Sequence, residues 1–132
     1  MRITADTNVL LRLIVPDDEV QQKLAAEALE AAESVAIGAH SLCELAWVME
    51  RSYGAERSDI AAAIRLLMAT GNVAMNRPMV EAGLKVLEAG GDFADGVIAF
   101  EGQWLGGETF VSFDRKAVKL IQRQGSEAVL LG

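Results

Sequence analysis

Four acidic side chains stand in apolar surroundings, where a charge is expensive unless another group compensates it. They are Asp6, Glu44, Asp95 and Asp114. Most of the other acids lie among polar residues, where solvation explains them. Four carboxylates brought close together would repel one another unless a cation were present. Oxygen ligands suit Mg²⁺, so if these acids are clustered they indicate a divalent-metal site, and such a metal can act on phosphate groups.

Asp6 and Asp114 share one arrangement, in which a short apolar run ends in an aspartate and a helix follows. Ligands of open α/β sheets bind at the carboxyl ends of the strands, so both residues would lie at a site. The structural alternative is that each aspartate is a helix N-cap. Because the arrangement occurs twice, capping alone is a less satisfactory explanation. We expect capping near Asp6 to fall to neighbours such as Thr7.

Glu44 and Asp95 have structural alternatives of their own. Ser41 and Glu44 fit the S-x-x-E capping box, which explains a glutamate but not its apolar neighbours. Asp92 is predicted to be the N-cap of a helix and Asp95 its third residue, where acids suit the positive helix end. Asp95 is less needed as a cap, because it leads a strongly apolar segment.

Basic residues gather directly after Asp114, in one short predicted helix. They are Arg115, Lys116, Lys119 and Arg123, a third of the twelve Lys and Arg. A solvated helix face explains them, since cations suit a helix C-terminus. A contact with a phosphate backbone is the functional alternative. His40 is the only histidine, and we interpret it as structural; a nuclease mechanism with two histidines as acid and base is excluded.

Short apolar runs alternate with longer amphipathic segments along the whole chain. The expected strands cover residues 2–6, 35–37, 73–75, 109–113 and 128–131. The expected helices cover residues 7–15, 17–33, 41–53, 58–69, 77–89, 92–105 and 115–124. This alternation predicts an α/β fold with a parallel sheet covered on both faces. In the second helix the 3.6-residue period assigns Val20, Leu24 and Ala28 to the buried face, with Leu29 as a fourth candidate.

Composition places the chain among folded single-domain proteins. Its 132 residues are 52% apolar, against a usual ~45–50%. The net charge of −7 argues against nucleic-acid binding, unless clustered acids hold a metal that contacts the phosphate. The single cysteine, Cys43, fits a reducing compartment. No signal peptide or membrane span is predicted, so we expect a cytoplasmic protein.

The acids and their neighbours, taken in order, resemble the PIN-domain family, and more narrowly the VapC-type toxin ribonucleases of prokaryotic toxin–antitoxin modules. The resemblance rests on Ala5-Asp6-Thr7-Asn8-Val9-Leu10, Glu44, Asp92-Phe93-Ala94-Asp95-x-x-Ile98-Ala99 and Ser112-Phe113-Asp114. It implies one PIN-like domain over residues 1–132, a three-layer α/β/α fold with a central parallel sheet of about four to five strands. Gly96 stands where a residue such as Ala is usual, at some cost in helix stability.

The same resemblance implies a Mg²⁺- or Mn²⁺-dependent endoribonuclease, the toxin of a type II toxin–antitoxin pair. It assigns Asp6, Glu44, Asp95 and Asp114 as catalytic metal ligands, with Asp92 as an auxiliary acid. It assigns Thr7, Asn8 and Ser112 as supporting residues. The basic helix would contact the RNA substrate through Arg115, Lys116 and Lys119. The implied partners are a cognate antitoxin and a second copy of the chain.

Two other functions remain open at this point. A phosphatase could use Asp6 as its nucleophile, but the usual second aspartate two residues later is Asn8 here. A catalytically silent PIN-like scaffold could bind RNA or protein without cleavage. Such a scaffold would have no need of the metal-site acids, and all four are present.

Overall fold

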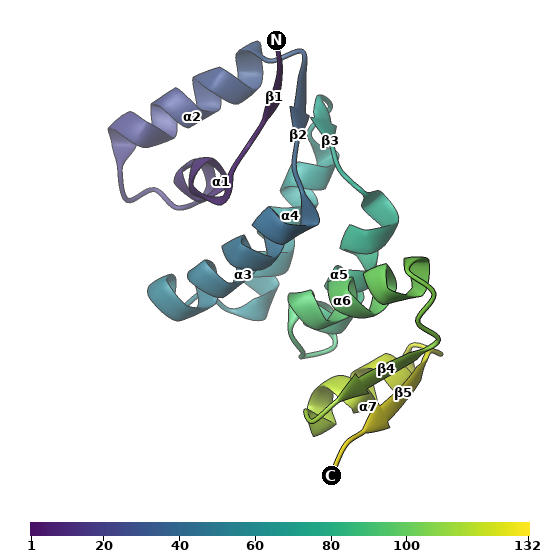
Figure 1. Ribbon diagram of the computed structural model, residues 1–132. Coiled ribbons are helices and arrows are strands. Elements are labelled where there is room, and N and C mark those ends of the chain that lie inside the picture. Colours follow the sequence, from purple (N-terminus) through teal and green to yellow (C-terminus); the bar gives the residue numbers. More distant parts are fainter. The chain divides into compact units, whose positions relative to one another are not determined.

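The computed structural model describes all 132 residues. The chain divides into two compact parts, the N-terminal part (Met1–Asn76) and the C-terminal part (Arg77–Gly132), and each is described by itself (Figure 1). A single domain over residues 1–132 stays a prediction. No helix is both long and apolar enough to cross a membrane.

The N-terminal part is built around a three-stranded parallel sheet in the order β1-β2-β3. Its strands are β1 (Arg2–Thr4), β2 (Ser34–Ala36) and β3 (Val73–Ala74). Its helices are α1 (Thr7–Ile14), α2 (Glu19–Ala31), α3 (Ala39–Tyr53) and α4 (Arg57–Ala69). Figure 1 shows the three strands side by side. Because the strands are parallel, the segments that follow β1 and β2 both leave the sheet at the end where the carboxyl termini of the strands lie.

Local sequence explains where these helices begin and end. Pro16 follows α1 closely, as expected of a residue that cannot continue a helix. Gly54 ends α3 with φ of 63°, a left-handed conformation that glycine adopts without strain. The core between the helices and the sheet contains Leu10, Val35, Leu42, Leu45 and Ile64, all fully buried.

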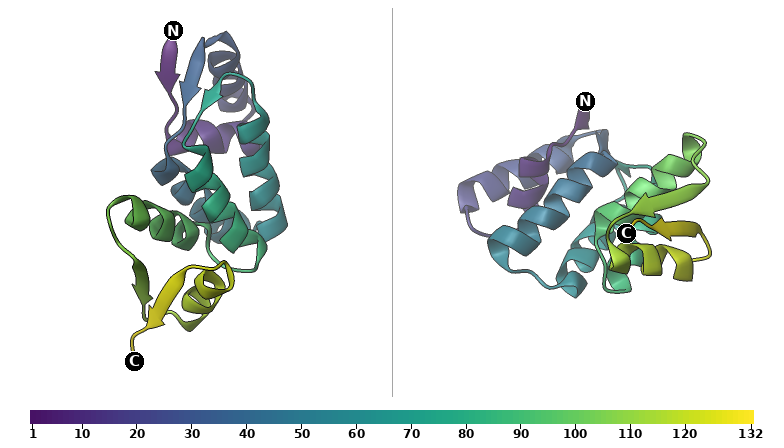
Figure 2. Two further views of the ribbon diagram at one scale, coloured as in Figure 1. Left: turned by 90° about the vertical axis from the view of Figure 1, so that its right-hand side faces the viewer. Right: turned by 60° about the horizontal axis from the view of Figure 1, so that its bottom comes forward.

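The C-terminal part combines three helices with a two-stranded parallel sheet. Its elements are α5 (Arg77–Glu88), α6 (Phe93–Trp104), β4 (Thr109–Ser112), α7 (Arg115–Arg123) and β5 (Glu127–Leu130). One face of the β4–β5 pair packs against α7 (Figure 2). The core of this part contains Val86, Val118, Leu120, Ile121 and Ala128.

Helices α5 and α6 approach each other so closely that glycine is required at the contact. A Cβ atom on Gly96 would overlap the backbone of Ala82 and lie 2.8 Å from Gly83 Cα. A Cβ atom on Gly83 would lie 2.6 Å from the ring of Phe93, which is fully buried. Gly96 therefore serves helix packing, whereas the sequence indicated only its cost in helix stability.

The α/β class with parallel strands is confirmed, and every predicted strand and helix is present with ends shifted by a few residues. The five strands form two sheets, of three and two strands. The predicted buried face of α2 is wrong for Val20, Leu24 and Ala28 and right for the fourth candidate, Leu29. Ala25 and Leu29 are buried, whereas Val20 and Leu24 are 71% and 60% exposed. The helix packs through Ala25 and Leu29, which lie four residues apart on one face, and this face is turned away from Val20 and Leu24.

Candidate active site

Asp6 lies at the point where the chain leaves the sheet and enters α1. The backbone N–H of Ala5 still donates to the carbonyl of Ala36 in β2, at 3.0 Å. Asp6 is extended, and its Oδ1 accepts a hydrogen bond from Val9 N at 3.0 Å. Asp6 is therefore the N-cap of α1, and the expectation that Thr7 would take this role is wrong. The cap uses Oδ1, and a carboxylate has a second oxygen that a ligand can use.

Glu44 is held beside the start of α1 by two contacts on one oxygen. Thr7 Oγ1 donates to Glu44 Oε1 at 3.1 Å, and His40 Nε2 lies 3.1 Å from the same atom. Glu44 is thus joined to the residue next to Asp6. The capping-box alternative is wrong, because α3 begins at Ala39 and places Ser41 inside the helix. The side chain of Glu44 is 46% exposed, so a ligand can reach it.

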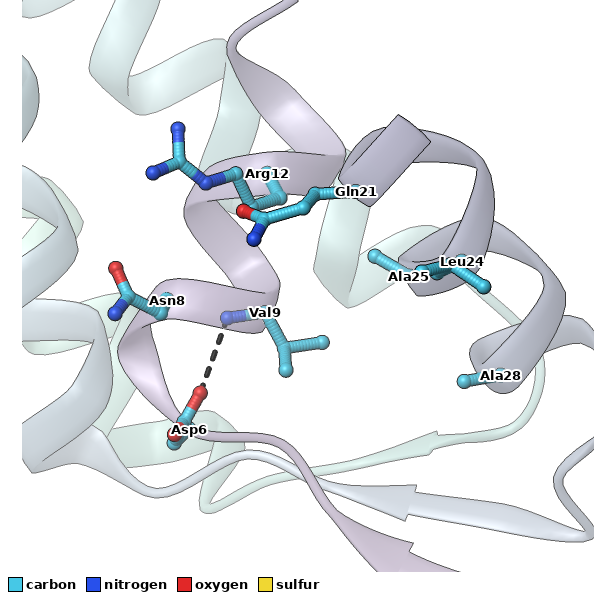
Figure 3. Close-up of a pocket in the computed structure, with 8 residues that line it drawn as sticks. All are labelled: Asp6, Asn8, Val9, Arg12, Gln21, Leu24, Ala25 and Ala28. Carbon is cyan, nitrogen blue, oxygen red and sulfur yellow. Dashed lines mark hydrogen bonds between the residues drawn. The ribbon is translucent and has the colours of Figure 1, made fainter. Parts of the chain in front are cut away.

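A pocket of about 430 Å³ opens beside Asp6, between α1 and α2 (Figure 3). Its lining includes Asp6 and Asn8 at the start of α1, and Arg12 one turn later. Asn8 therefore lies near Asp6, and its role in supporting the acids stays a prediction.

In the C-terminal part, Asp92 and Asp95 occupy the first turn of α6. Asp92 is the N-cap, accepting from Ala94 N at 3.0 Å, and Asp95 is the third helical residue, as predicted. Partial burial raises the pKa of Asp95 from 3.8 to about 6, helped by the negative charges of Asp92 and Asp114. Three carboxylates of this part thus share one electrostatic environment, and a bound cation would relieve their repulsion.

Asp114 is the N-cap of α7. Its Oδ1 accepts from Lys116 N at 2.9 Å and from Ala117 N at 3.1 Å. Ser112 Oγ accepts from Asp114 N at 3.0 Å, so this serine fixes the backbone of the aspartate. The side chains of Arg115, Lys116 and Lys119 are exposed.

The donor chemistry of these residues fits Mg²⁺ or Mn²⁺, since all the candidate ligands are carboxylate oxygens. The raised pKa of Asp95 comes first from burial and then from the charges of Asp92 and Asp114, and a nearby cation would offset both causes. No group of three or more His, Cys, Asp or Glu side chains is placed to hold a metal.

The family model described as PIN domain matches residues 3–121, which is most of the chain. The chain belongs to the PIN-domain family. The match includes every acid of the candidate set and the basic residues at the start of α7. It supports the nuclease class of enzyme that the sequence resemblance implied.

Among solved structures, this PIN domain is similar to the VapC20 toxin of Mycobacterium tuberculosis, described as cleaving the sarcin–ricin loop. The sequence identity is 15%, and the match covers 83% of this chain and 86% of that chain with a TM-score of 0.44. A comparison with curated proteins gives no match.

Two features of this PIN domain were missed in the sequence. The contact of His40 with Glu44 was not predicted, although it leaves the structural interpretation of His40 untested. Its place four residues before Glu44, on one helix face, was the available signal. The pocket beside Asp6 was also missed. No sequence signal could have found it, because the pocket depends on how α1 and α2 pack against each other.

Proposed function

We propose that this PIN domain is a Mg²⁺- or Mn²⁺-dependent endoribonuclease that hydrolyses RNA phosphodiesters. The catalytic metal ligands are Asp6, Glu44, Asp95 and Asp114, with Asp92 as an auxiliary acid. One observation carries the proposal: the pKa of the half-buried Asp95 is raised to about 6 beside two further carboxylates. Burial is the larger cause of this shift, and the negative charges of Asp92 and Asp114 add to it, so a cation bound beside these carboxylates would stabilise their charged forms. Family membership supplies the reaction class.

The chain's own groups hold the acids in fixed orientations. Backbone N–H groups at the starts of α1 and α7 fix Oδ1 of Asp6 and of Asp114. Thr7 and His40 fix Glu44 through Oε1. When bound, the divalent ion supplies an activated water and stabilises charge on the phosphate and the leaving oxygen. The carboxylates need to be oriented before the metal and the substrate bind, because misplaced ligands lower the reaction rate steeply.

The RNA backbone contacts α7 in this proposal. Arg115, Lys116 and Lys119 are exposed and follow directly after Asp114. They provide local positive charge on a chain whose net charge is −7, and this lets phosphates approach the acids. Ser112 supports the site through the backbone of Asp114, and Asn8 is proposed to support Asp6.

The biological role proposed is that of the toxin in a type II toxin–antitoxin pair. Its partners would be RNA, a cognate antitoxin and a second copy of the chain in a homodimer, acting in the cytoplasm. The VapC-type order of motifs supports this role. Toxicity on induced expression, relieved by co-expression of a neighbouring small gene product, would test it.

The decisive test is Asp6→Asn, assayed for cleavage of a labelled RNA in Mg²⁺ or Mn²⁺. Asn caps helices as well as Asp does, so α1 and the melting temperature should be retained. Cleavage should be abolished, because the amide loses the negative charge that the metal needs. Asp18→Asn is the matched control: Asp18 caps α2 in the same way, accepting from Gln21 N at 3.0 Å, and lies outside the candidate set.

Removal of metal by EDTA should abolish wild-type cleavage, and added Mn²⁺ should restore it. Wild-type rates in EDTA or in Asp6→Asn would show that the mechanism is wrong. RNA binding with neither cleavage nor Mn²⁺ binding would instead favour the silent scaffold.

A further inference from the structure

Two polar contacts tie α1 to α3 in the N-terminal part, one toward each end of α1. At the start of α1, Thr7 Oγ1 donates to Glu44 Oε1 at 3.1 Å. Toward its end, Arg12 Nη1 donates to Asp17 Oδ1 at 2.8 Å, and the hydroxyl of Tyr53 donates to Asp17 Oδ2 at 2.6 Å. Asp17 lies in the turn between α1 and α2, and Tyr53 is the last residue of α3. The three residues of this second contact are here called the distal tie.

Asp17 is held on both of its carboxylate oxygens, so its orientation is fixed. The hydrogen bond from Tyr53 lowers the pKa of Asp17, and the contact with Arg12 lowers it further. Asp17 therefore stays charged at neutral pH and accepts from both partners. Arg12 and Asp17 belong to one continuous segment, which consists of α1 and the turn after it. Within the distal tie, the hydroxyl of Tyr53 is therefore the group that joins this segment to α3.

The side chain of Arg12 serves the distal tie rather than the pocket beside Asp6. Its guanidinium points away from Leu24 and Ala28, which line the pocket from α2 (Figure 3). Its Nε atom is buried and has no hydrogen-bond partner, and a buried donor without an acceptor costs stability. Ion pairs that are partly exposed add little net stability, so stability alone does not explain the distal tie.

The two contacts lie far enough apart to set the angle between the helices. At about 1.5 Å per residue, Arg12 lies roughly 7.5 Å from Thr7 along α1, and Tyr53 lies roughly 13.5 Å from Glu44 along α3. Helix α1 also packs on α3, but apolar packing is non-directional and resists a small pivot less than two polar contacts do. A pivot of about 10° at Arg12 would move Thr7 by about 1.3 Å, which is enough to break its hydrogen bond to Glu44.

We propose that the distal tie positions the candidate active site, by holding α1 against α3 at the angle that the metal ligands require. Its residues touch neither metal nor RNA in this proposal. They act through Thr7, which follows Asp6 and joins α1 to Glu44. A misplacement of about 1 Å can lower a reaction rate about a hundredfold, so a pivot of this size would matter. The inference rests on the proposed function, because it takes Asp6 and Glu44 as metal ligands.

The test is Tyr53→Phe, which removes one hydroxyl group and leaves the charges of Arg12 and Asp17 in place. Mn²⁺ affinity, measured by titration calorimetry in the absence of RNA, should fall about tenfold, the lower end of the effect of losing a group that orients metal ligands. In the metal-free protein, the backbone NMR signals of Thr7 and Glu44 should shift as well. Both residues lie more than one helical turn from the distal tie, so a purely local effect of the missing hydroxyl would not reach them.

Asn72→Ala is the matched control, because it removes a tie of the same part that does not involve α1 or α3. Asn72 Nδ2 donates to the carbonyls of Leu29 and Ala32, at 2.8 and 3.1 Å, and so holds the end of α2. Its loss should lower the melting temperature at least as much as Tyr53→Phe does. Mn²⁺ affinity and the signals of the active-site residues should stay as in the wild type. An equal loss of Mn²⁺ affinity in this control would show that the effect is one of general stability and would overturn the proposal.

A double variant separates positioning from two independent effects. In Thr7→Val the contact that the distal tie positions is already lost, so adding Tyr53→Phe should weaken Mn²⁺ binding by less than about twofold more. A second loss of about tenfold would mean that the two sites act independently, and it would overturn the proposal. Unchanged Mn²⁺ affinity in Tyr53→Phe alone would overturn it as well. If the wild type binds no Mn²⁺, the proposed metal site is wrong, and the NMR signals of Thr7 and Glu44 then decide by themselves whether the distal tie holds α1 against α3.

Discussion

Gly96→Ala offers the sharpest test of the packing that positions Asp95, because two effects of the same methyl group oppose each other. In a free helix the change would stabilise the protein by up to ~1 kcal/mol, since Gly is a poor helix former. In α6 the new Cβ would overlap the backbone of Ala82 and approach Gly83 Cα to 2.8 Å. These are backbone atoms, which cannot rotate away as a flexible side chain would.

The magnitude follows from weighing these two effects. Overpacking of this kind typically costs ~1–3 kcal/mol, so the net expectation is a destabilisation of up to about 2 kcal/mol. For a chain of this length that corresponds to a drop in melting temperature of several degrees. Cleavage should fall as well, because Asp95 is the neighbour of Gly96 and moves with the first turns of α6 when the two helices separate.

Gly102→Ala is the matched control, because it introduces the same methyl group in the same helix. A Cβ atom there meets nothing within 4 Å, so only the gain in helix propensity remains, reduced by its place near the helix end. Thermal and urea unfolding of the two variants should therefore give changes of opposite sign. If Gly96→Ala is as stable as the wild type or more so, the close approach of α5 and α6 is wrong.

Three further predictions concern the acids and the basic helix. Asp95→Asn, in metal-free buffer, should raise the melting temperature near pH 8, and this advantage over the wild type should disappear toward pH 4. The pKa of Asp95 in the folded protein is about 6, above the ordinary 3.8. The stability of the wild type therefore falls as the pH rises from 3.8 to about 6, because the unfolded chain loses this proton first. An offset that does not change with pH would contradict this. Lys116→Gln with Lys119→Gln should weaken RNA binding alike for all sequences and reduce the salt slope by ~0.7 per lost phosphate contact, measured by fluorescence anisotropy; an unchanged slope would place the RNA elsewhere. Thr7→Val should reduce the cleavage rate much more than the melting temperature, since it removes a half-exposed hydrogen bond to Glu44 worth ~0.5–1.5 kcal/mol, and Thr7→Ser should restore the rate.

The sequence was a good guide to the secondary structure and a poor one to what its helices pack against. Hydrophobic periodicity, Pro16 and the glycines after α3, α5 and α6 predicted all twelve helices and strands. Periodicity alone could not choose the buried face of α2, because Val20 and Leu24 share a helical period with Ala28 while the core uses Ala25 and Leu29. The need for glycine at position 96 was equally hidden, since it depends on the backbone of another helix.

The same limit applies to the candidate site. The acids could be chosen from the sequence because each stood in apolar company, but their contacts depend on three-dimensional neighbours. The hydrogen bond from Thr7 to Glu44 joins residues 37 positions apart. The contact of His40 with Glu44 was within reach of a simple helical-spacing argument, and a lone histidine was nevertheless interpreted as structural.

Capping and metal binding are compatible roles for the strand-end aspartates, and the geometry indicates why one residue type serves both. A strand that ends at the sheet edge and turns at once into a helix needs an acceptor for the first free N–H groups. Asp6 and Asp114 each satisfy this need with Oδ1. The hydrogen bond fixes the carboxyl group at the end of the strand where ligands bind, and it uses Oδ1 while Oδ2 can still contact a cation. The capping hydrogen bond, first considered as an alternative to a functional role, would therefore hold a catalytic carboxylate in place. Because Asn caps a helix as Asp does, a difference in RNA cleavage between Asp and Asn should come from the charge of the side chain alone.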